Sequence, residues 1–203
     1  DYYRAARIVS NPEPPALESS KPLAIPAPHG TIPARIYTPN TLRKKDGLAP
    51  CLVFFHGGGW VIGDLDTHEV VCQKLAHEGE LIVISIDYRL APEHRFPAAV
   101  DDAVTATRWV AANARDLGID AARLTVGGDS AGGNLAAVVA LTARAGGPKL
   151  AAQLLIYPAT DFSRKHPSHS EPETSILLTH SVIGWFANHY LGDADSNDWR
   201  ASP

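Results

Sequence analysis

The chain has 203 residues, of which 45% are hydrophobic and 20% charged, and its formal net charge at pH 7 is −4. These values fit one globular domain with a sizeable core. Its 18 lysines and arginines are scattered along the chain, which argues against nucleic acid as a partner, and no apolar run approaches the roughly 18 residues of a membrane span. A small neutral substrate suits this balance better.

The first expected element is a short helical pattern that runs into a proline-rich stretch within residues 1–20. Proline locks φ and removes an amide donor, so this segment should lie across the body of the protein without nucleating it. Two extended runs follow at residues 21–28 and 31–39, on either side of a His29-Gly30 pair. They predict an antiparallel hairpin in which proline marks edge positions.

From residue 51 onward, continuous apolar runs alternate with amphipathic helical stretches. Strands are expected at residues 51–55, 81–87, 123–127 and 151–157, and helices at residues 66–79, 98–118, 131–147 and 179–192. Asp66 and Glu69 have the spacing of a capping box, and Gly79 is placed to follow the end of its helix. Strand and helix in strict alternation predict right-handed crossovers and a mostly parallel sheet covered by helices.

Ser130 lies in the sequence GGDSAGG, residues 127–133, where a predicted strand meets a predicted helix. The match to G-x-S-x-G predicts a sharp, strained turn that presents the serine at the carboxyl edge of the sheet. Gly128 and Gly132 would remove collisions two positions to either side, and the dipole of the next helix would face developing negative charge. Ser130 is therefore a candidate nucleophile; the competing interpretation is a tight turn that happens to contain a serine.

Residues 56–60, HGGGW, directly follow another predicted strand. Three successive glycines let backbone N–H groups point into a site without obstruction, which an oxyanion hole requires. We expect Gly58 and Gly59 to be the donors, completed by the N–H of Ala131. The alternatives are a flexible glycine loop and a phosphate-binding loop; against the second, neither G-x-x-x-x-G-K-[ST] nor G-x-G-x-x-G occurs. His56 is expected to brace the loop and not to act as a base.

HGGGW, GDSAGGN and the intervening DYRLAPEHRFPAA together resemble the hormone-sensitive-lipase-like branch of the α/β-hydrolases, bacterial family IV. The resemblance runs from about Ile36 to the last residue. It implies an α/β-hydrolase fold with a partial helical cap, and carboxylesterase activity on short acyl esters with no cofactor and no metal. It assigns the same roles to Ser130 and to the three N–H donors. The segment with Asp87, Arg89 and Glu93 looks like the family's buried polar support, which we interpret as structural.

The resemblance also implies a cap made from the N-terminal segment and from an excursion late in the chain. The expected division is a partial N-terminal cap segment at residues 1–20, an incomplete hydrolase core at 21–173 and a cap-helix excursion at 174–203. Candidate walls of an acyl pocket are Trp60, Trp185, Phe186 and Tyr190. An aromatic stripe on a helix is equally typical of ordinary packing.

A serine hydroxyl needs a histidine to take its proton and an acid to orient that histidine. After Ser130 the candidates are Asp161, Glu171, Glu173, Asp193, Asp195 and Asp198, with His166, His169, His180 and His189. None follows a recognisable strand in the order serine, acid, histidine that this fold requires. We therefore expect the last strands, the acid and the base to lie beyond residue 203, and residues 1–203 alone to be inactive. We also expect no histidine of this chain within hydrogen-bond distance of Ser130.

The leading hypothesis is a serine carboxylesterase that hydrolyses short-chain acyl esters through an acyl-enzyme on Ser130. The alternatives are a non-catalytic small-ligand receptor on the same fold, and an amidase or lactam hydrolase that uses the same serine. The expected partner is a small-molecule ester, with no nucleic acid and no membrane, and a homodimer is left open. Cys51 and Cys72 fit buried packing positions in a reducing compartment, so a cytoplasmic location is expected.

Overall fold

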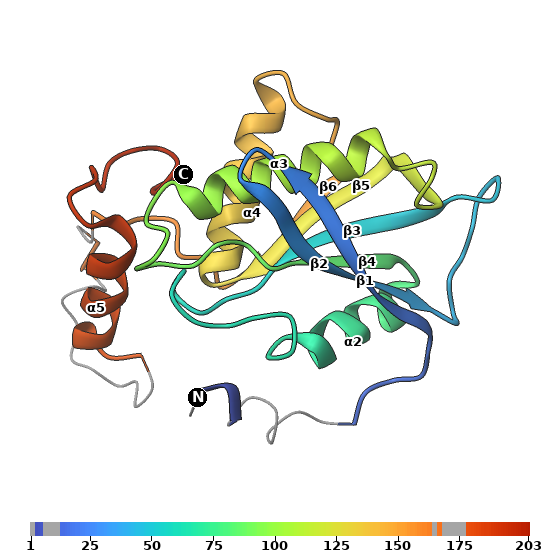
Figure 1. Cartoon of the computed structure of the whole chain (residues 1–203), viewed down its shortest axis with the longest axis horizontal. Helices are drawn as coiled ribbons and strands as arrows, with labels where there is room; N and C mark the ends of the chain where they lie inside the picture. The colour runs from blue at the N-terminus through green and yellow to red at the C-terminus, as the bar shows by residue number, and fades with distance from the viewer. Residues whose placement is uncertain (1–2, 6–12, 164–165, 168–177) are drawn as a thin grey trace.

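A computed structural model describes residues 3–5, 13–163, 166–167 and 178–203 of the chain. Within these ranges, six strands form one sheet in the order β1-β2-β4-β3-β5-β6 (Figure 1). The strands are β1 (Leu17–Ala27), β2 (Gly30–Pro39), β3 (Ala49–Phe55), β4 (Ile82–Ile86), β5 (Ile119–Asp129) and β6 (Ala152–Ile156). The long helices are α2 (Glu69–Gly79), α3 (Ala98–Ala112), α4 (Ala131–Arg144) and α5 (His180–Leu191).

The N-terminal hairpin is confirmed, since β1 and β2 pair antiparallel with Ala27 opposite Gly30. Strand β2 also pairs antiparallel with β4 over residues 34–37. The prediction that prolines mark edge positions is therefore correct for β1 and wrong for β2, which lies inside the sheet. Pro33 is tolerated there because it falls just before the stretch paired with β4, and its carbonyl accepts the N–H of Asp87 at 2.9 Å.

The predicted mostly parallel arrangement is confirmed for the other strands, because β3 pairs in parallel with both β4 and β5, and β5 with β6. The chain runs from β3 to β4 on one side and then crosses to β5 on the other. Strands β3 and β5 are neighbours in register, with Phe55 opposite Gly128. The loops that follow their carboxyl ends therefore meet at one edge of the sheet, where ligands bind in open α/β sheets.

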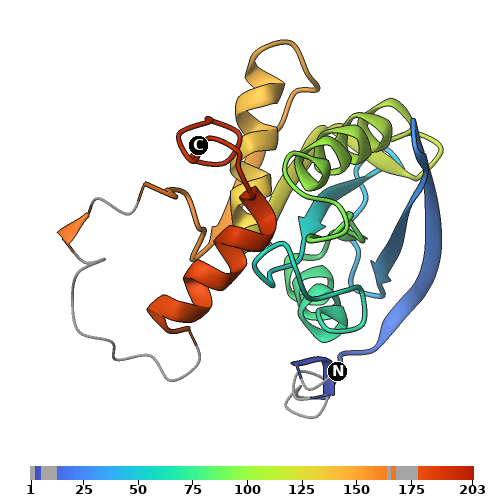
Figure 2. The same cartoon turned by 60° about the vertical axis from the view of Figure 1, so that its left-hand side comes forward.

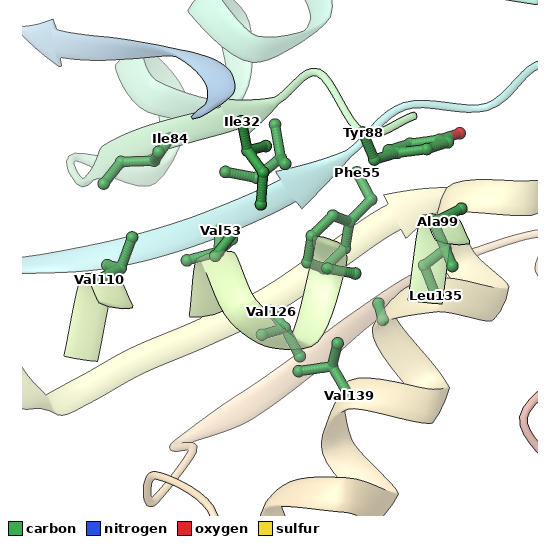
Figure 3. Packing of buried hydrophobic residues seen from close by; sticks show 14 of the residues in the cluster. Ile32, Val53, Phe55, Ile84, Tyr88, Ala99, Val110, Val126, Leu135 and Val139 are labelled. Atoms are coloured by element: carbon green, nitrogen blue, oxygen red, sulfur yellow. The ribbon is translucent and has the colours of Figure 1, made fainter. Parts of the chain in front are cut away.

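Two layers of helices cover the sheet, as the alternation of buried side chains along β3 shows. Val53 and Phe55 belong to the larger core cluster, together with residues of α3 and α4, whereas Leu52 and Phe54 pack with Cys72 and Ala76 of α2. Figure 3 shows the first of these faces, where sheet residues meet side chains of α3 and α4. Cys51 and Cys72 are both buried free thiols.

The start of α2 differs from the sequence prediction. The helix begins at Glu69 with His68 as its N-cap residue, and no side chain caps it. Residues 64–67 form a separate turn in which the backbone N–H groups of Asp64 and Thr67 each donate to the other's side chain. Asp66 therefore makes no capping box and instead accepts from Arg35 at 3.0 Å. At the other end Glu80, and not a glycine, takes the left-handed conformation, with φ of 52°.

Helix α5 projects beside the sheet, and the chain after it returns to the core near α4 (Figure 2). Ala201 is fully buried, and its carbonyl accepts from the side chain of Asn134 on α4 at 2.7 Å. At the far side of the described sheet, β6 forms an edge with Leu154 37% exposed. None of the helices in the described ranges has the length and apolar character needed to cross a bilayer.

Candidate active site

Ser130 occupies the turn between β5 and α4 with φ of 54° and ψ of −114°, a strained conformation for a residue with a side chain. Its N–H donates to the carbonyl of Ile156 at 2.9 Å, which ties the turn to β6. A Cβ at Gly132 would lie 1.9 Å from the carbonyl oxygen of Phe55, and one at Gly128 would lie 2.4 Å from it. The expected need for small residues on both sides of the serine is confirmed.

The glycine loop after β3 approaches this turn. Gly58 has φ of 128°, and a Cβ there would lie 1.9 Å from the carbonyl oxygen of Ile62. Among the described residues, no hydrogen bond uses the N–H of Gly58, Gly59 or Ala131. Ala131 is the first residue of α4, where the N–H has no partner within the helix. Three unpaired donors at the ends of adjacent strands form an arrangement that can bind an oxyanion.

His56 lies behind the glycine loop. Its ring stacks on Tyr88 with centroids 4.4 Å apart, and Nδ1 lies 2.8 Å from the carbonyl oxygen of Gly57. Complete burial, reinforced by the nearby His68, lowers the pKa of His56 to about 4. The ring is therefore neutral at pH 7 and donates Nδ1–H to Gly57, which is the bracing role expected from the sequence.

Asp129 joins the serine turn to the glycine loop, a role that the sequence interpretation missed. Its Oδ1 accepts the N–H of Gly57 at 2.9 Å, and His68 Nε2 lies 3.4 Å from Oδ2. Burial alone would raise the pKa of this carboxyl group, but the hydrogen bond and charge of His68 and the N–H of Gly57 hold it below its usual value. An acidic residue directly before a candidate nucleophile was the available sequence signal.

A cavity of about 360 Å³ opens beside Ser130. Its lining includes Gly59, Trp60, Ser130, Asp161, His166 and Phe186. Of the four predicted pocket walls, Trp60 and Phe186 line this cavity, and Trp185 and Tyr190 do not. Tyr190 is buried behind Trp60, whereas Trp185 is 47% exposed on α5. Phe186 and Tyr190 are four residues apart and share a helix face, from which Trp185 is rotated away.

None of the candidate bases in the described ranges is hydrogen-bonded to the serine, because no hydrogen bond joins Ser130 Oγ to a histidine there. His166 lines the cavity, but its side chain is 70% exposed and its Nε2 lies 3.7 Å from Asp161 Oδ2. His189 Nδ1 instead contacts the carbonyl of Trp185 at 2.9 Å, on α5.

The other candidates are placed elsewhere or fall outside the description. His180 is exposed at the start of α5, and Asp193 is exposed just after it. The carboxylates of Asp195 and Asp198 accept from Asn197 and Arg200. His169, Glu171 and Glu173 lie outside the described residues.

The expected polar support is only partly buried. Arg89 Nε donates to Asp102 Oδ2 and its Nη2 to Oδ1, both at 2.9 Å, and Asp102 is 1% exposed. Glu93 is exposed, so the prediction that it is buried is wrong, and the buried acid is Asp102 on α3. Burial and the charges of nearby acids raise the pKa of Asp87 to about 6. Within the described ranges, no group of three or more His, Cys, Asp or Glu residues is arranged to hold a metal ion.

The alpha/beta hydrolase fold family matches residues 52–203. Esterase LipI of Mycobacterium tuberculosis is 48% identical over 174 residues, covering 85% of this chain and 54% of LipI. Ethyl acetate hydrolase of Pseudomonas putida is 43% identical over 179 residues, covering 85% of this chain and 55% of that protein.

Among solved structures, an ester hydrolase from the metagenome of Lake Arreo, complexed with a derivative of bipyridine phosphonate, superposes with a TM-score of 0.93 at 43% identity. The superposition covers 100% of this chain and 64% of that one. The chain spans about half the length of the curated relatives it matches.

Proposed function

We propose that this chain, which belongs to the hormone-sensitive-lipase-like branch of the α/β-hydrolase family, carries the nucleophile of a serine carboxylesterase acting on short-chain acyl esters. The observation that carries the proposal is the strained Ser130 beside a cavity, with three backbone N–H groups that are unpaired among the described residues. The names of the relatives, an esterase and an ethyl acetate hydrolase, support the same class of reaction.

In the proposed reaction, Ser130 Oγ attacks the ester carbonyl carbon. The carbonyl oxygen becomes an oxyanion that accepts hydrogen bonds from the N–H groups of Gly58, Gly59 and Ala131. A histidine takes the hydroxyl proton and returns it to the leaving alcohol, and water then hydrolyses the acyl-enzyme. We assign neither that histidine nor its acid among the described residues.

The cavity supports a small substrate. A volume of about 360 Å³ lies at the low end of the range for small-molecule sites. Trp60 and Phe186 give its wall an apolar, aromatic surface next to Ser130, which suits a short acyl group. Trp185 and Tyr190, in this proposal, belong to the support of α5 and not to the wall.

Three finer points remain predictions. The two buried thiols, Cys51 and Cys72, support a cytoplasmic location. Assembly into a homodimer is the second of these predictions. The division at residues 20 and 173 also stays a proposal, although β1 already begins at Leu17 and Ala201 returns to the core.

The test is hydrolysis of p-nitrophenyl butyrate by the complete protein that carries this sequence, compared with its Ser130→Ala variant. We expect release of p-nitrophenol that falls to the background rate in the variant. A protein that binds the ester without turnover would favour the receptor. Faster cleavage of the matching anilide than of the ester would favour the amidase.

A further inference from the structure

The side chain of Asp129 connects the glycine loop after β3, here called the donor loop, to the turn that carries Ser130. Asp129 immediately precedes Ser130, and Gly57, whose N–H it accepts at 2.9 Å, immediately precedes Gly58. A Cβ on Gly57 would lie 2.3 Å from Asp129 Oδ2, so the carboxylate packs directly against the loop backbone. The orientation of this carboxylate therefore fixes the loop relative to the nucleophile.

His68 in turn orients the carboxylate. Its Nε2 lies 3.4 Å from Oδ1 and 3.4 Å from Oδ2 of Asp129, so the ring nitrogen faces both oxygens equally. Both side chains are buried, with His68 1% and Asp129 7% exposed. A buried carboxylate is costly without donors, and the donors here are His68 and the N–H of Gly57.

Thr67 contacts the other ring nitrogen of His68. Thr67 Oγ1 has one proton and lies 2.9 Å from the carbonyl oxygen of Asp64 and 3.1 Å from His68 Nδ1. The hydroxyl can therefore either donate to Nδ1 or, while donating to Asp64, accept from a protonated Nδ1. An Nε2 without a proton would turn its lone pair toward the two carboxylate oxygens of Asp129, which is unfavourable, so the geometry favours Nε2–H as the donor to Asp129.

We propose that His68 is a positioning residue of the esterase: through Asp129 it holds Gly57, and thereby aims the N–H groups of Gly58 and Gly59 at the substrate oxyanion. The inference rests on the proposed function of Ser130. His68 does not line the cavity, so we do not expect it to contact the substrate. Because the oxyanion forms only in the transition state, replacing His68 should lower kcat more than it raises KM.

The experiment compares His68→Leu and His68→Gln in the complete protein, with kcat and KM for p-nitrophenyl butyrate and the melting temperature as readouts. The amide of glutamine can still donate to Asp129, whereas leucine cannot. Loss of one oxyanion donor lowers kcat by about 100- to 1,000-fold. His68→Leu leaves the donors in place but less firmly held, so we expect kcat to fall by about 10- to 100-fold while KM stays within about threefold of the wild-type value. For His68→Gln we expect a kcat near that of the wild type.

Two further variants separate positioning from stability. Val110→Ala removes core packing on α3, away from the cavity, and should lower the melting temperature without lowering kcat. If His68→Leu does not fold, Thr67→Val removes the hydroxyl behind His68, and we expect a smaller loss of kcat, about 3- to 10-fold.

The inference is overturned if His68→Leu, or Thr67→Val where His68→Leu does not fold, keeps wild-type kcat. It is also overturned if His68→Gln lowers kcat as much as His68→Leu does. The same holds if Val110→Ala, at the melting temperature of His68→Leu, lowers kcat as much as that variant does. A wild-type protein with no turnover and no covalent labelling of Ser130 would overturn the proposed function, and the role of His68 with it. An active wild type with an unaffected His68→Leu variant removes the positioning role alone.

Discussion

The rings of Trp60 and Tyr190 are stacked, with centroids 4.4 Å apart and planes 5° from parallel. Trp60 ends the glycine loop and Tyr190 lies on α5. One turn earlier on the same helix, Phe186 packs so closely on Gly59 that a Cβ there would lie 2.3 Å from its ring. Two aromatic side chains of α5, Phe186 and Tyr190, therefore pack against the donor loop. Substitution of either side chain should affect both the helix and the loop.

The hydroxyl of Tyr190 is buried without a hydrogen-bond partner among the described residues. Because an unpaired buried hydroxyl is unfavourable, Tyr190→Phe should leave the free energy of unfolding unchanged or raise it by up to about 1 kcal/mol. Tyr190→Ala, which also removes the stacked ring, should lower it by about 3–5 kcal/mol. Urea unfolding measures both. Equal losses in the two variants would show that the hydroxyl, and not the ring, holds α5.

A methyl group at Gly132 should be far more damaging than one at Gly184. At Gly132 the Cβ would overlap the backbone of Phe55, which cannot move without displacing β3. We expect Gly132→Ala to lower the free energy of unfolding by at least about 3 kcal/mol. At Gly184, on α5, nothing lies within 4 Å of the Cβ, and the alanine should stabilise the helix by about 0.5–1 kcal/mol. Thermal unfolding of both variants checks the contrast, and a tolerated Gly132→Ala would contradict it.

Asp87 should make the protein less stable as the pH rises. Burial raises its pKa from 3.8 to about 6, so between pH 4 and 6 the folded state binds more protons than the unfolded state and stability falls with increasing pH. The full shift corresponds to about 3 kcal/mol. Because the carboxyl group is partly exposed, we expect Asp87→Asn to stabilise by about 1–2 kcal/mol at pH 8 and by almost nothing near pH 4.

The control for Asp87→Asn is Glu93→Gln, which removes the same charge from an exposed side chain. Urea unfolding at pH 4, 6 and 8 compares the two variants with the wild type. A gain from Asp87→Asn that is the same at every pH would refute the titration of Asp87 as its cause.

Phe186 should limit the length of the acyl chain, because its ring forms a wall of the cavity beside Ser130. In the complete protein, Phe186→Ala should raise the ratio of kcat/KM for p-nitrophenyl octanoate to that for the butyrate by about tenfold. Trp199→Ala removes an exposed ring outside this cavity and should leave the ratio unchanged. An unchanged ratio in Phe186→Ala would place the acyl group elsewhere.

Sequence patterns predicted the features of this fold that depend on local geometry. The hairpin, the four parallel strands and the glycines around Ser130 follow from periodicity and from the shape of one turn. The position of β4 between β2 and β3 did not follow, since it depends on how distant segments pair. The start of α2 differs from the sequence prediction because Asp64 and Thr67 use their polar groups in a separate turn before the helix.

The candidate site divides in the same way. Ser130 and the donor glycines were found from their motifs, but the link from His68 through Asp129 to Gly57 joins residues 61 and 72 positions apart. Hydrophobic periodicity cannot predict such a contact, because the contact forms only when β3 and β5 pair as neighbours in the sheet. For the same reason the buried partner of Arg89 was identified only from the packing of α3, as Asp102.

The most direct test of the central claim is covalent labelling of the complete protein with a p-nitrophenyl alkylphosphonate, read by mass spectrometry of its peptides. If Ser130 is the nucleophile, its Oγ displaces p-nitrophenolate from phosphorus, one phosphonyl group appears on the peptide that contains Ser130, and hydrolysis of p-nitrophenyl butyrate stops in proportion. An unlabelled Ser130 in a protein that hydrolyses the ester, or equal hydrolysis by Ser130→Ala, would contradict the assignment.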